Sequence, residues 1–410
     1  MLAHLLPKAA VLRRFHNGPL GCHIDGFVAH LLSRGYKTST TKNKVRVVAG
    51  LNQWLDRRGF GVRDFDEQQV QAFLRSSRRS AEGEPAVTLR QLLEYFRAQG
   101  VIPPPAAQVS DSPLARLERD FKRYLSEERA LAQSTAVHPI LWMRRFLAES
   151  FGTKRIDFKE LDAQTITRFV LRHAQPLSSW GAVGMVASLR HFLGFLYLRG
   201  AIVNDLAACV PSVAHWRLST VPRFLSREQV EHLLKSCDQS TATGQRNYAI
   251  LLLLARLGLR AGEVVAMELE DIDWECGELT VRGKGLRRDR LPLPHDVGKA
   301  LARYLRHGRP CCSTRRVFVR RRAPHEGFAL STTIRSIVCR TLARAGLNPP
   351  HKGAHLLRHS LATDMLRKGA SLSQIGEVLR HQRLNTTQIY AKVDLVALRK
   401  LAQPWPGGDA

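Results

Sequence analysis

The side chains best suited to chemistry lie near the end of the chain, between His355 and Tyr390. His355, Arg358 and His359 are spaced at i, i+3 and i+4, so a helix would present them on one face. His381 and Tyr390 follow within the same stretch. Arginine binds anions through its planar fork, histidine exchanges protons near neutral pH, and a tyrosine hydroxyl can act as a nucleophile. One such residue alone would most simply be a solvated surface group, but the whole set indicates a site that binds an anion and attacks it.

The sequence around these residues predicts the elements that hold them. Apolar residues recur at helical spacing over 356–366, and Gly369 is placed to end that helix. Ser371 is placed to cap a second helix that ends near His381, and a third short segment carries the tyrosine. The reactive side chains are therefore expected on short, mostly helical elements.

Two further candidates precede this stretch. An apolar run reaches Leu257 and predicts a buried helix ended by Gly258, so the core should hold Arg260 in place. Gly283-Lys284-Gly285 separates two short alternating runs, which predicts a hairpin with Lys284 at its exposed tip. On their own, an arginine at a helix end and a lysine on a turn are common surface residues.

These motifs resemble the C-terminal signature of the tyrosine recombinases, the phage integrase family, over roughly residues 113–403. The departure is Arg380, where the family usually has glycine; it could alter the turn or add a phosphate contact. The matching residues are His355-x-x-Arg358-His359 for the family's His-x-x-Arg-His, Leu379-Arg380-His381 for its Leu-Gly-His, Leu259-Arg260-x-x-Glu263 for its first arginine box, and Tyr390 for its nucleophile.

The resemblance implies phosphoryl transfer to DNA through a 3′-phosphotyrosyl link, with no metal and no cofactor. Rigid guanidinium groups suit this reaction because negative charge builds on the nonbridging oxygens. The implied roles are Arg260 and Arg358 on those oxygens, Tyr390 as nucleophile, His355 as base, His381 as hydrogen-bond donor to the phosphate, and Lys284 as the acid that protonates the leaving 5′ hydroxyl. Glu263 is expected to be structural, and His359 to orient its neighbours.

The charge of the chain points to the same partner. Lys and Arg number 63 against 35 Asp and Glu, which gives a formal net charge of +28. Such an excess most often indicates nucleic acid. We therefore expect double-stranded DNA as the partner, and the resemblance implies a homotetramer on that DNA.

The sequence also bears on the compartment. The most apolar run, Tyr248 to Leu259, is short and contains Arg256, so no membrane span and no membrane partner are expected. The 7 cysteines form no CxxC pairs, so neither zinc nor a structural disulfide is expected. A cytoplasmic protein, associated with the nucleoid when on DNA, is the expectation.

Helical patterns and breakers divide the chain into tandem modules. Residues 161–169 line up with 65–73, and 189–202 with 89–102, which predicts that two modules are copies of each other. The fold is predicted to be mainly α and multidomain, with tandem helical (SAM-like) DNA-binding modules before an α-rich catalytic domain that contains a small β-hairpin. The expected boundaries are a leader 1–22, a first module 23–102, a Pro-rich linker 103–112, a core-binding module 113–205, a linker 206–222, the catalytic domain 223–403 and a tail 404–410.

The polar faces of these regions carry cations that a DNA backbone could contact. The candidates are Lys42, Lys44, Arg46, Arg144, Arg145, Arg287 and Arg288. For the first module, DNA contact and a protein–protein role in assembly both stay open. The amphipathic segment 394–401 is expected, as in the family, to dock on a neighbouring protomer.

The predicted function is a site-specific DNA recombinase of integrase or transposase type. The extra N-terminal module favours a mobile-element role over chromosome-dimer resolution. Two alternatives stay open: a type IB topoisomerase-like enzyme that nicks and religates DNA, and a DNA-binding regulator that has lost catalysis.

Overall fold

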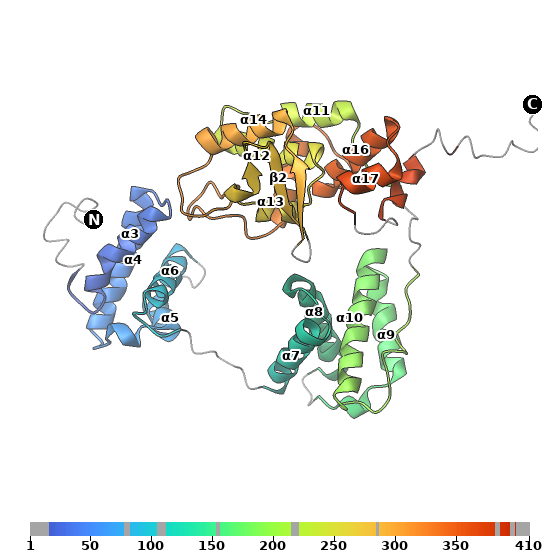
Figure 1. The fold of residues 1–410 in the computed structure, drawn as a ribbon. Helices are drawn as coiled ribbons and strands as arrows, with labels where there is room; N and C mark the ends of the chain where they lie inside the picture. Colours follow the sequence, from blue (N-terminus) through green and yellow to red (C-terminus); the bar gives the residue numbers. More distant parts are fainter. Residues whose placement is uncertain are drawn as a thin grey trace, which may run out of the picture. The chain divides into compact units, whose positions relative to one another are not determined.

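The computed structural model describes residues 16–77, 83–104, 112–152, 156–214, 221–283, 287–381, 386–393 and 398. Contacts group the chain into two compact units, residues 1–104 with 220–410, and residues 105–219. Separate hydrophobic cores hold residues between 20 and 102, between 121 and 210, between 225 and 357, and, in a smaller cluster, between 362 and 390. Figure 1 shows the described helices and strands, coloured along the chain. The domain boundaries drawn from the sequence stay a prediction.

The first module is built from four main helices, as its sequence pattern predicts. Asp66 caps α5 by accepting hydrogen bonds from the amides of Gln68 and Gln69, at 2.8 and 3.0 Å. Gly100 adopts a φ of +68° just past the last helix, a conformation that favours glycine. The helices are α3 (Ile24–Ser33), α4 (Thr38–Asp56), α5 (Glu67–Ser76) and α6 (Glu84–Ala98), with 3-10 turns at Gly21–His23 and Val62–Asp64.

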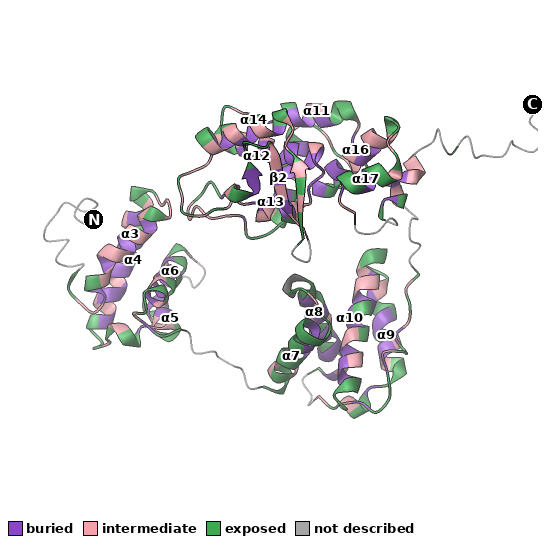
Figure 2. Cartoon of the chain, in the orientation of Figure 1, coloured by how far each residue is buried: buried purple, intermediate pink, exposed green. Residues whose placement is uncertain are grey.

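The second module repeats this plan. Asp162 caps α9 by accepting from the amide of Thr165 at 2.7 Å, and Gly200 follows the last helix with a φ of +67°. Buried and exposed residues alternate along α10 (Figure 2). The elements are α7 (Pro113–Arg123), a π-helical turn (Tyr124–Glu128), α8 (Gln133–Phe151), a 3-10 turn (Phe158–Glu160), α9 (Ala163–Ala174) and α10 (Ser179–Leu198).

Ring contacts in the two cores match at aligned positions. Trp54 and Phe73 meet edge to face with centroids 5.9 Å apart, and Phe146 and Phe169 do the same at 5.1 Å. Each pair joins the second main helix of its module to the third. This agreement favours the interpretation of the modules as copies.

The folded parts of both modules extend beyond the segments that the sequence assigned to them. Leu20, expected in the leader, is fully buried, and its amide donates to Asn52 Oδ1 at 2.8 Å. Val210, expected in a linker, is 2% exposed, and its carbonyl accepts a 2.9 Å hydrogen bond from Arg190. Helical periodicity missed both because each segment packs without being a regular helix.

One described helix, α10, is long and apolar enough to cross a membrane by length and composition. Half of its most apolar window, 50%, is buried inside the protein, and Phe192 and Leu193 are fully buried in the second core. The most apolar run named from the sequence, Tyr248 to Leu259, lies elsewhere, in α12 and just after it. Core helices of folded modules pass the same test.

The region after residue 220 surrounds one long buried helix, α12. Ser226 and Gln229 form a capping box on α11, and Gly258, with a φ of +58°, follows α12. The described strands form an antiparallel sheet of order β1-β2-β3, in which Leu279 faces Leu291. The first part comprises α11 (Arg227–Lys235), α12 (Ala242–Arg256), α13 (Ala261–Ala266), a 3-10 turn (Leu269–Asp271), β1 (Ile272–Asp273), β2 (Glu278–Arg282) and β3 (Arg288–Pro292).

Helices complete this region, and the last of them carry the predicted reactive residues. Ser371 caps α17 by accepting from the amide of Gln374 at 3.2 Å, and Gly369 adopts a φ of +87° after α16, both as expected. The elements are α14 (His295–Arg303), a π-helical turn (Tyr304–Gly308), α15 (Thr332–Arg344), α16 (Ala354–Arg367), α17 (Leu372–Val378) and a 3-10 helix (Gln388–Val393). The predicted tail helix over 394–401 lies outside the described residues, apart from residue 398.

Lys44 is not on the polar face where the sequence placed it. Its side chain is 2% exposed, and its Nζ lies 3.2 Å from Thr88 Oγ1 and 3.1 Å from Glu84 Oε1. The ammonium group is buried because a hydroxyl and a carboxylate on the facing helix pair with it. Its assignment to DNA contact is therefore wrong.

The other predicted DNA-binding cations keep more exposure. Arg46 is exposed and donates to Asn43, while Lys42 is half-buried. Arg144 forms a bidentate ion pair with Glu118, with both contacts at 2.8 Å, so part of its charge is already balanced. The exposed side chains are those of Arg46, Arg144, Arg145, which stacks on Trp142, and Arg287 and Arg288 beside the hairpin tip.

Candidate active site

Arg260 is held at the junction of two helices by a single carboxylate. It stands at the N-terminus of α13, one turn before Glu263. The carboxylate of Glu263 accepts the backbone amide of Arg260 at 2.8 Å and its Nη1 at 2.7 Å. Both the backbone and the guanidinium group of Arg260 are thereby oriented, in keeping with the structural part expected of Glu263.

Arg358 lies deeper, on α16, with 4% of its surface exposed. Its guanidinium group donates to the carbonyl oxygens of Gly258 and Leu379. These bonds tie α16 to the turn that precedes Arg260 and to the end of α17. An arginine anchored at both ends keeps a fixed orientation, as charge stabilisation in a transition state requires.

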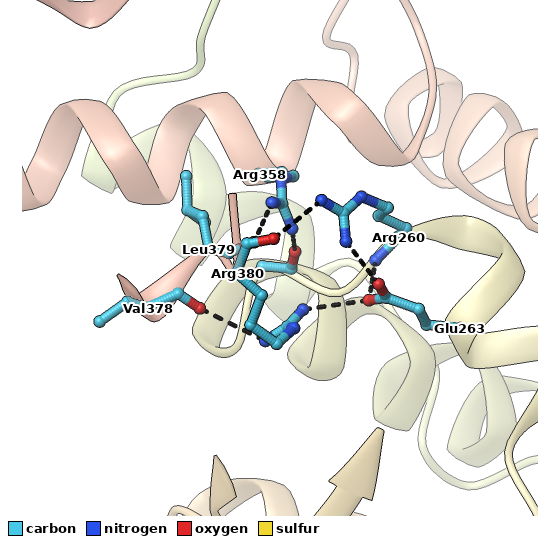
Figure 3. A network of polar contacts seen from close by, with 7 residues as sticks. Arg260, Glu263, Arg358, Val378, Leu379 and Arg380 are labelled. Atoms are coloured by element: carbon cyan, nitrogen blue, oxygen red, sulfur yellow. Dashed lines mark hydrogen bonds and ion pairs between the residues drawn. The ribbon is translucent and has the colours of Figure 1, made fainter. Parts of the chain in front are cut away.

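The two guanidinium groups converge, as the sequence predicted. Arg358 binds the carbonyl of Leu379, and Arg260 Nη2 lies 3.3 Å from the carbonyl of the next residue, Arg380. Figure 3 shows both groups directed at this short piece of backbone. Residues about a hundred positions apart in sequence thus form one cationic cluster.

The cluster is electrostatically unfavourable without an anion. Burial, followed by the nearby charges of Arg260 and Arg380, lowers the pKa of Arg358 to about 10. The guanidinium group therefore remains charged at neutral pH but is poorly solvated. A phosphate placed among these groups would relieve their mutual repulsion.

Tyr390 lies within hydrogen-bond distance of a histidine, but not of the histidine expected. Its ring is 1% exposed, and its hydroxyl lies 2.8 Å from Nδ1 of His359. Burial raises the pKa of Tyr390 to about 12, although Arg358 opposes the shift. Burial, with the charges of His355 and Arg358, lowers the pKa of His359 to about 4. At neutral pH the phenol of Tyr390 therefore keeps its proton, and the imidazole of His359 is neutral.

The remaining histidines line the same cluster. His381 Nδ1 lies 2.7 Å from Thr387 Oγ1, and burial, with Arg358 and Arg260, lowers the pKa of His381 to about 4. His355 keeps an exposed surface, and its ring centroid is 6.4 Å from that of His359. Desolvation by surrounding groups, with Arg358 and Arg260, lowers the pKa of His355.

The hairpin that was predicted to carry Lys284 is present. β2 and β3 pair in register from Glu278 with Pro292 to Arg282 with Arg288. Lys284 itself lies outside the described residues. Its placement relative to the arginine cluster stays a prediction.

Three contacts of the cluster were not anticipated from the sequence. His359 meets the tyrosine directly, Thr387 pairs with His381, and Arg380 pairs with Glu263 at 3.0 Å. Helical spacing does put His359 beside His355, but nothing local indicates which of them faces a residue 31 positions later. For Arg380 the available signal was its departure from the usual glycine.

Comparison with known proteins finds the same family that the sequence motifs resemble. Residues 223–395 match the model of the phage integrase family. A putative integrase/recombinase, y4rA, of Sinorhizobium fredii is 44% identical over 97% of this chain and 97% of its own length. The tyrosine recombinase XerD of Lacticaseibacillus casei is 31% identical over 70% of this chain and 97% of its own.

Solved structures share the fold. The XerH site-specific recombinase bound to a palindromic difH substrate aligns with a TM-score of 0.56 at 20% identity, over 77% of this chain and 94% of that one. The Tn1549 transposon integrase in complex with a circular intermediate DNA aligns with a TM-score of 0.51 at 16% identity, over 70% and 99%. With these relatives and the converging arginine boxes, the chain belongs to the phage integrase family of tyrosine recombinases, which are site-specific DNA strand transferases.

Proposed function

We propose that this protein cuts and rejoins double-stranded DNA at a specific site through a covalent bond between Tyr390 and a 3′ phosphate. The observation that carries the proposal is the convergence of Arg260 and Arg358 beside a buried tyrosine whose hydroxyl is hydrogen-bonded to a neutral imidazole. This arrangement supplies fixed positive charge, a nucleophile and a proton acceptor.

The proposed reaction follows from these groups. Arg260 and Arg358 bind the nonbridging oxygens of the phosphodiester, where negative charge accumulates. The oxygen of Tyr390 attacks phosphorus, the bond to the 5′ oxygen breaks, and a 3′-phosphotyrosyl link forms. The phenolic proton passes to a histidine. His355 is the expected base, and His359 is the histidine whose Nδ1 lies 2.8 Å from the hydroxyl. Lys284 is proposed to protonate the departing 5′ oxygen, and His381 to hydrogen-bond the phosphate.

Double-stranded DNA is the partner that chemistry and charge favour. The formal net charge of +28 supplies sequence-independent attraction to a phosphate backbone. The XerH and Tn1549 proteins were both solved on DNA, which supports the same partner here. Strand exchange between two duplexes needs several active sites, so we further propose a homotetramer on DNA.

A mobile-element role is favoured over chromosome-dimer resolution. The y4rA relative, which spans almost the whole chain, bears the name integrase/recombinase. The first helical module precedes the second along the chain, and the second is proposed to be the core-binding module. We propose that the protein acts on the nucleoid, where its first module contacts either DNA or another protomer.

The deciding experiment is covalent capture. Purified protein is mixed with nicked suicide substrates made from the DNA that it binds, and adducts are separated under denaturing conditions. The wild type should become attached, and Tyr390→Phe should not. Tyr304→Phe is the matched control, because Tyr304 is also 1% exposed but lies in the core beneath α12, and it should still be captured.

The outcomes separate the candidate functions. Absence of any adduct would contradict the proposal and favour a regulator without catalysis. Relaxation of a supercoiled plasmid that lacks the bound site would favour a topoisomerase-like enzyme. Attachment of both the wild type and Tyr390→Phe would show that another residue is the nucleophile.

A further inference from the structure

Arg380 has a backbone conformation that favours glycine. Its φ is +54°, in the left-handed region that side chains other than those of Asn and Asp rarely adopt. Its amide donates to the carbonyl of Glu377 at 2.9 Å and so closes the end of α17. A bulky residue at such a position indicates that its side chain has a use.

That side chain points into the arginine cluster. It is 7% exposed, and its Nη2 lies 3.0 Å from Glu263 Oε2, while Nη1 lies 3.3 Å from the carbonyl of Val378 (Figure 3). Its Nε is buried with no hydrogen-bond partner in the described part of the chain. The left-handed backbone of Arg380 and its unpaired Nε both raise the free energy of the folded state. The ion pair with Glu263 is the contact that offsets this cost.

Glu263 is thereby shared between two arginines. Its Oε1 binds the guanidinium group of Arg260 at 2.7 Å, and its Oε2 accepts both the Arg260 amide at 2.8 Å and Arg380 at 3.0 Å. The side chain of Glu263 is 5% exposed, so water cannot balance its charge. Without Arg380, Arg260 alone would neutralise this carboxylate.

The balance of charges decides how much positive charge is left to bind a phosphate. Three guanidinium groups and one carboxylate leave the cluster with a net charge of 3 − 1 = +2, and glycine at position 380 would leave 2 − 1 = +1. Fixed positive charge in a desolvated site stabilises the charge that develops on a phosphorane-like transition state. An unshared Glu263 carboxylate would offset the charge of Arg260, so the pairing of Arg380 with Glu263 bears on the chemical step.

We propose that Arg380 is a positioning residue, which binds Glu263 so that the guanidinium group of Arg260 keeps its charge and orientation for the scissile phosphate. The inference rests on the proposed function, because it assumes that Arg260 meets that phosphate. Arg380 itself is proposed to act through Glu263 and not by touching DNA.

The test measures DNA cleavage in a single turnover with saturating protein, alongside DNA affinity. Arg380→Gln removes the charge, and Arg380→Lys keeps it. Arg380→Gly also removes the charge and relieves the left-handed backbone, so it keeps the test valid if the glutamine variant fails to fold. For both uncharged variants we expect a cleavage rate at least about tenfold lower, with DNA affinity within about threefold of the wild type. Arg380→Lys should recover most of the rate.

A double-mutant cycle with Glu263→Gln tests whether Arg380 acts through Glu263. If Arg380 works through Glu263, then Arg380→Gln should change the rate less than about threefold when Glu263→Gln is already present. Ala130→Gly is the backbone control, because Ala130 also has a positive φ, of 49°, but lies in the second module. It should leave cleavage unchanged.

Three results would overturn the inference. These are wild-type cleavage by Arg380→Gly, an equal loss of rate in the Glu263→Gln background, or a loss confined to DNA affinity. Each leaves the proposed function intact as long as the wild type is captured on DNA. If the wild type is not captured, it is the proposed function that fails.

Discussion

The two helical modules share one architecture but treat one matched interior position differently. In the first, Lys44 is buried against Thr88 and Glu84 on the facing helix. In the second, the residues aligned with Lys44 and Thr88 are Ala136 and Ser188, which are 2% and 3% exposed. Thr88 and Ser188 each donate to the carbonyl four residues earlier, at 2.9 and 2.7 Å, so the helices themselves are alike. The same frame thus holds an ion pair in one copy and small side chains in the other.

The difference shows that a buried lysine depends on the residues opposite it more than on the architecture of the surrounding helices. Glu84 supplies the carboxylate in the first module, whereas the aligned residue of the second is Gly184. A charge in a core is tolerated only where a hydrogen-bonded counter-charge meets it. Exchanging residues between the modules tests this directly. Because unfolding of a multidomain chain is not two-state, hydrogen exchange followed separately in each module is the suitable measurement.

The largest effect is expected from placing a lysine in the core of the second module. Ala136→Lys should destabilise the second module by about 3–5 kcal/mol, because no carboxylate stands opposite the new ammonium group. Peptides from α8 and α10 should lose protection from exchange, and those from α4 and α6 should not. Unchanged protection in α8 would mean that the lysine reaches solvent and that a buried counter-charge is not required at this position.

The reverse exchange should be milder. Lys44→Ala should cost the first module about 1–3 kcal/mol, through lost packing and lost hydrogen bonding, while Thr88 keeps its backbone bond. DNA affinity and its salt dependence should not change, because the ammonium group is buried. Arg46→Ala, which removes an exposed cation from the same helix, is the matched control. A lower salt slope in Lys44→Ala would contradict the structure.

The helix caps should behave as near equals. Asp66→Ala and Asp162→Ala should each cost their own module about 1 kcal/mol. Asp66 accepts two amides and Asp162 one, so the loss in the first module should be slightly larger. Exchange of the amides in the first turns of α5 and α9 would measure both. A cap that cost its module nothing would remove one of the features that the two modules share.

The smallest expected difference is one of pH. His30 contacts Tyr95 in the first core, where the second has Tyr124 against Phe195. Burial, followed by the charge of Arg34, lowers the pKa of His30 below its usual 6.5. The unfolded chain therefore binds the proton first as pH falls, so this part of the stability is present above pH 6.5 and is lost below it. The protection of the first module, taken as its exchange rate relative to the intrinsic rate at the same pH, should fall from about pH 7 to about pH 5.5, and His30→Tyr should abolish this change. An equal loss of protection in both modules would assign the effect to other groups.

Much of the fold could be predicted because its determinants are local. Asp66, Asp162, Gly100 and Gly200 mark helix ends through the backbone conformation or through contacts within a few residues. Lys44 could not be assigned in this way. Its partners lie on another helix some forty residues away, and the period of its own helix does not show that a carboxylate and a hydroxyl meet it.

The candidate site shows the same difference between local determinants and contacts made far along the chain. The motifs indicated that Arg260 and Arg358 act together, and their side chains do converge. The pairing of Tyr390 with His359 depends on how a short 3-10 helix packs against α16, which spacing does not specify. Arg380 was identified as a departure from its family, but only the three-dimensional position of Glu263 gives it a partner.

The burial of Tyr390 has a consequence for how often such a protein cuts chromosomal DNA outside its target. With 1% of its surface exposed, the hydroxyl cannot meet a DNA strand until the segment that carries it shifts. A molecule that scans random duplex would then make few adventitious cuts, because scanning leaves the tyrosine covered. Damage to the genome would be limited by the rarity of the event that uncovers it and not by the strength of binding.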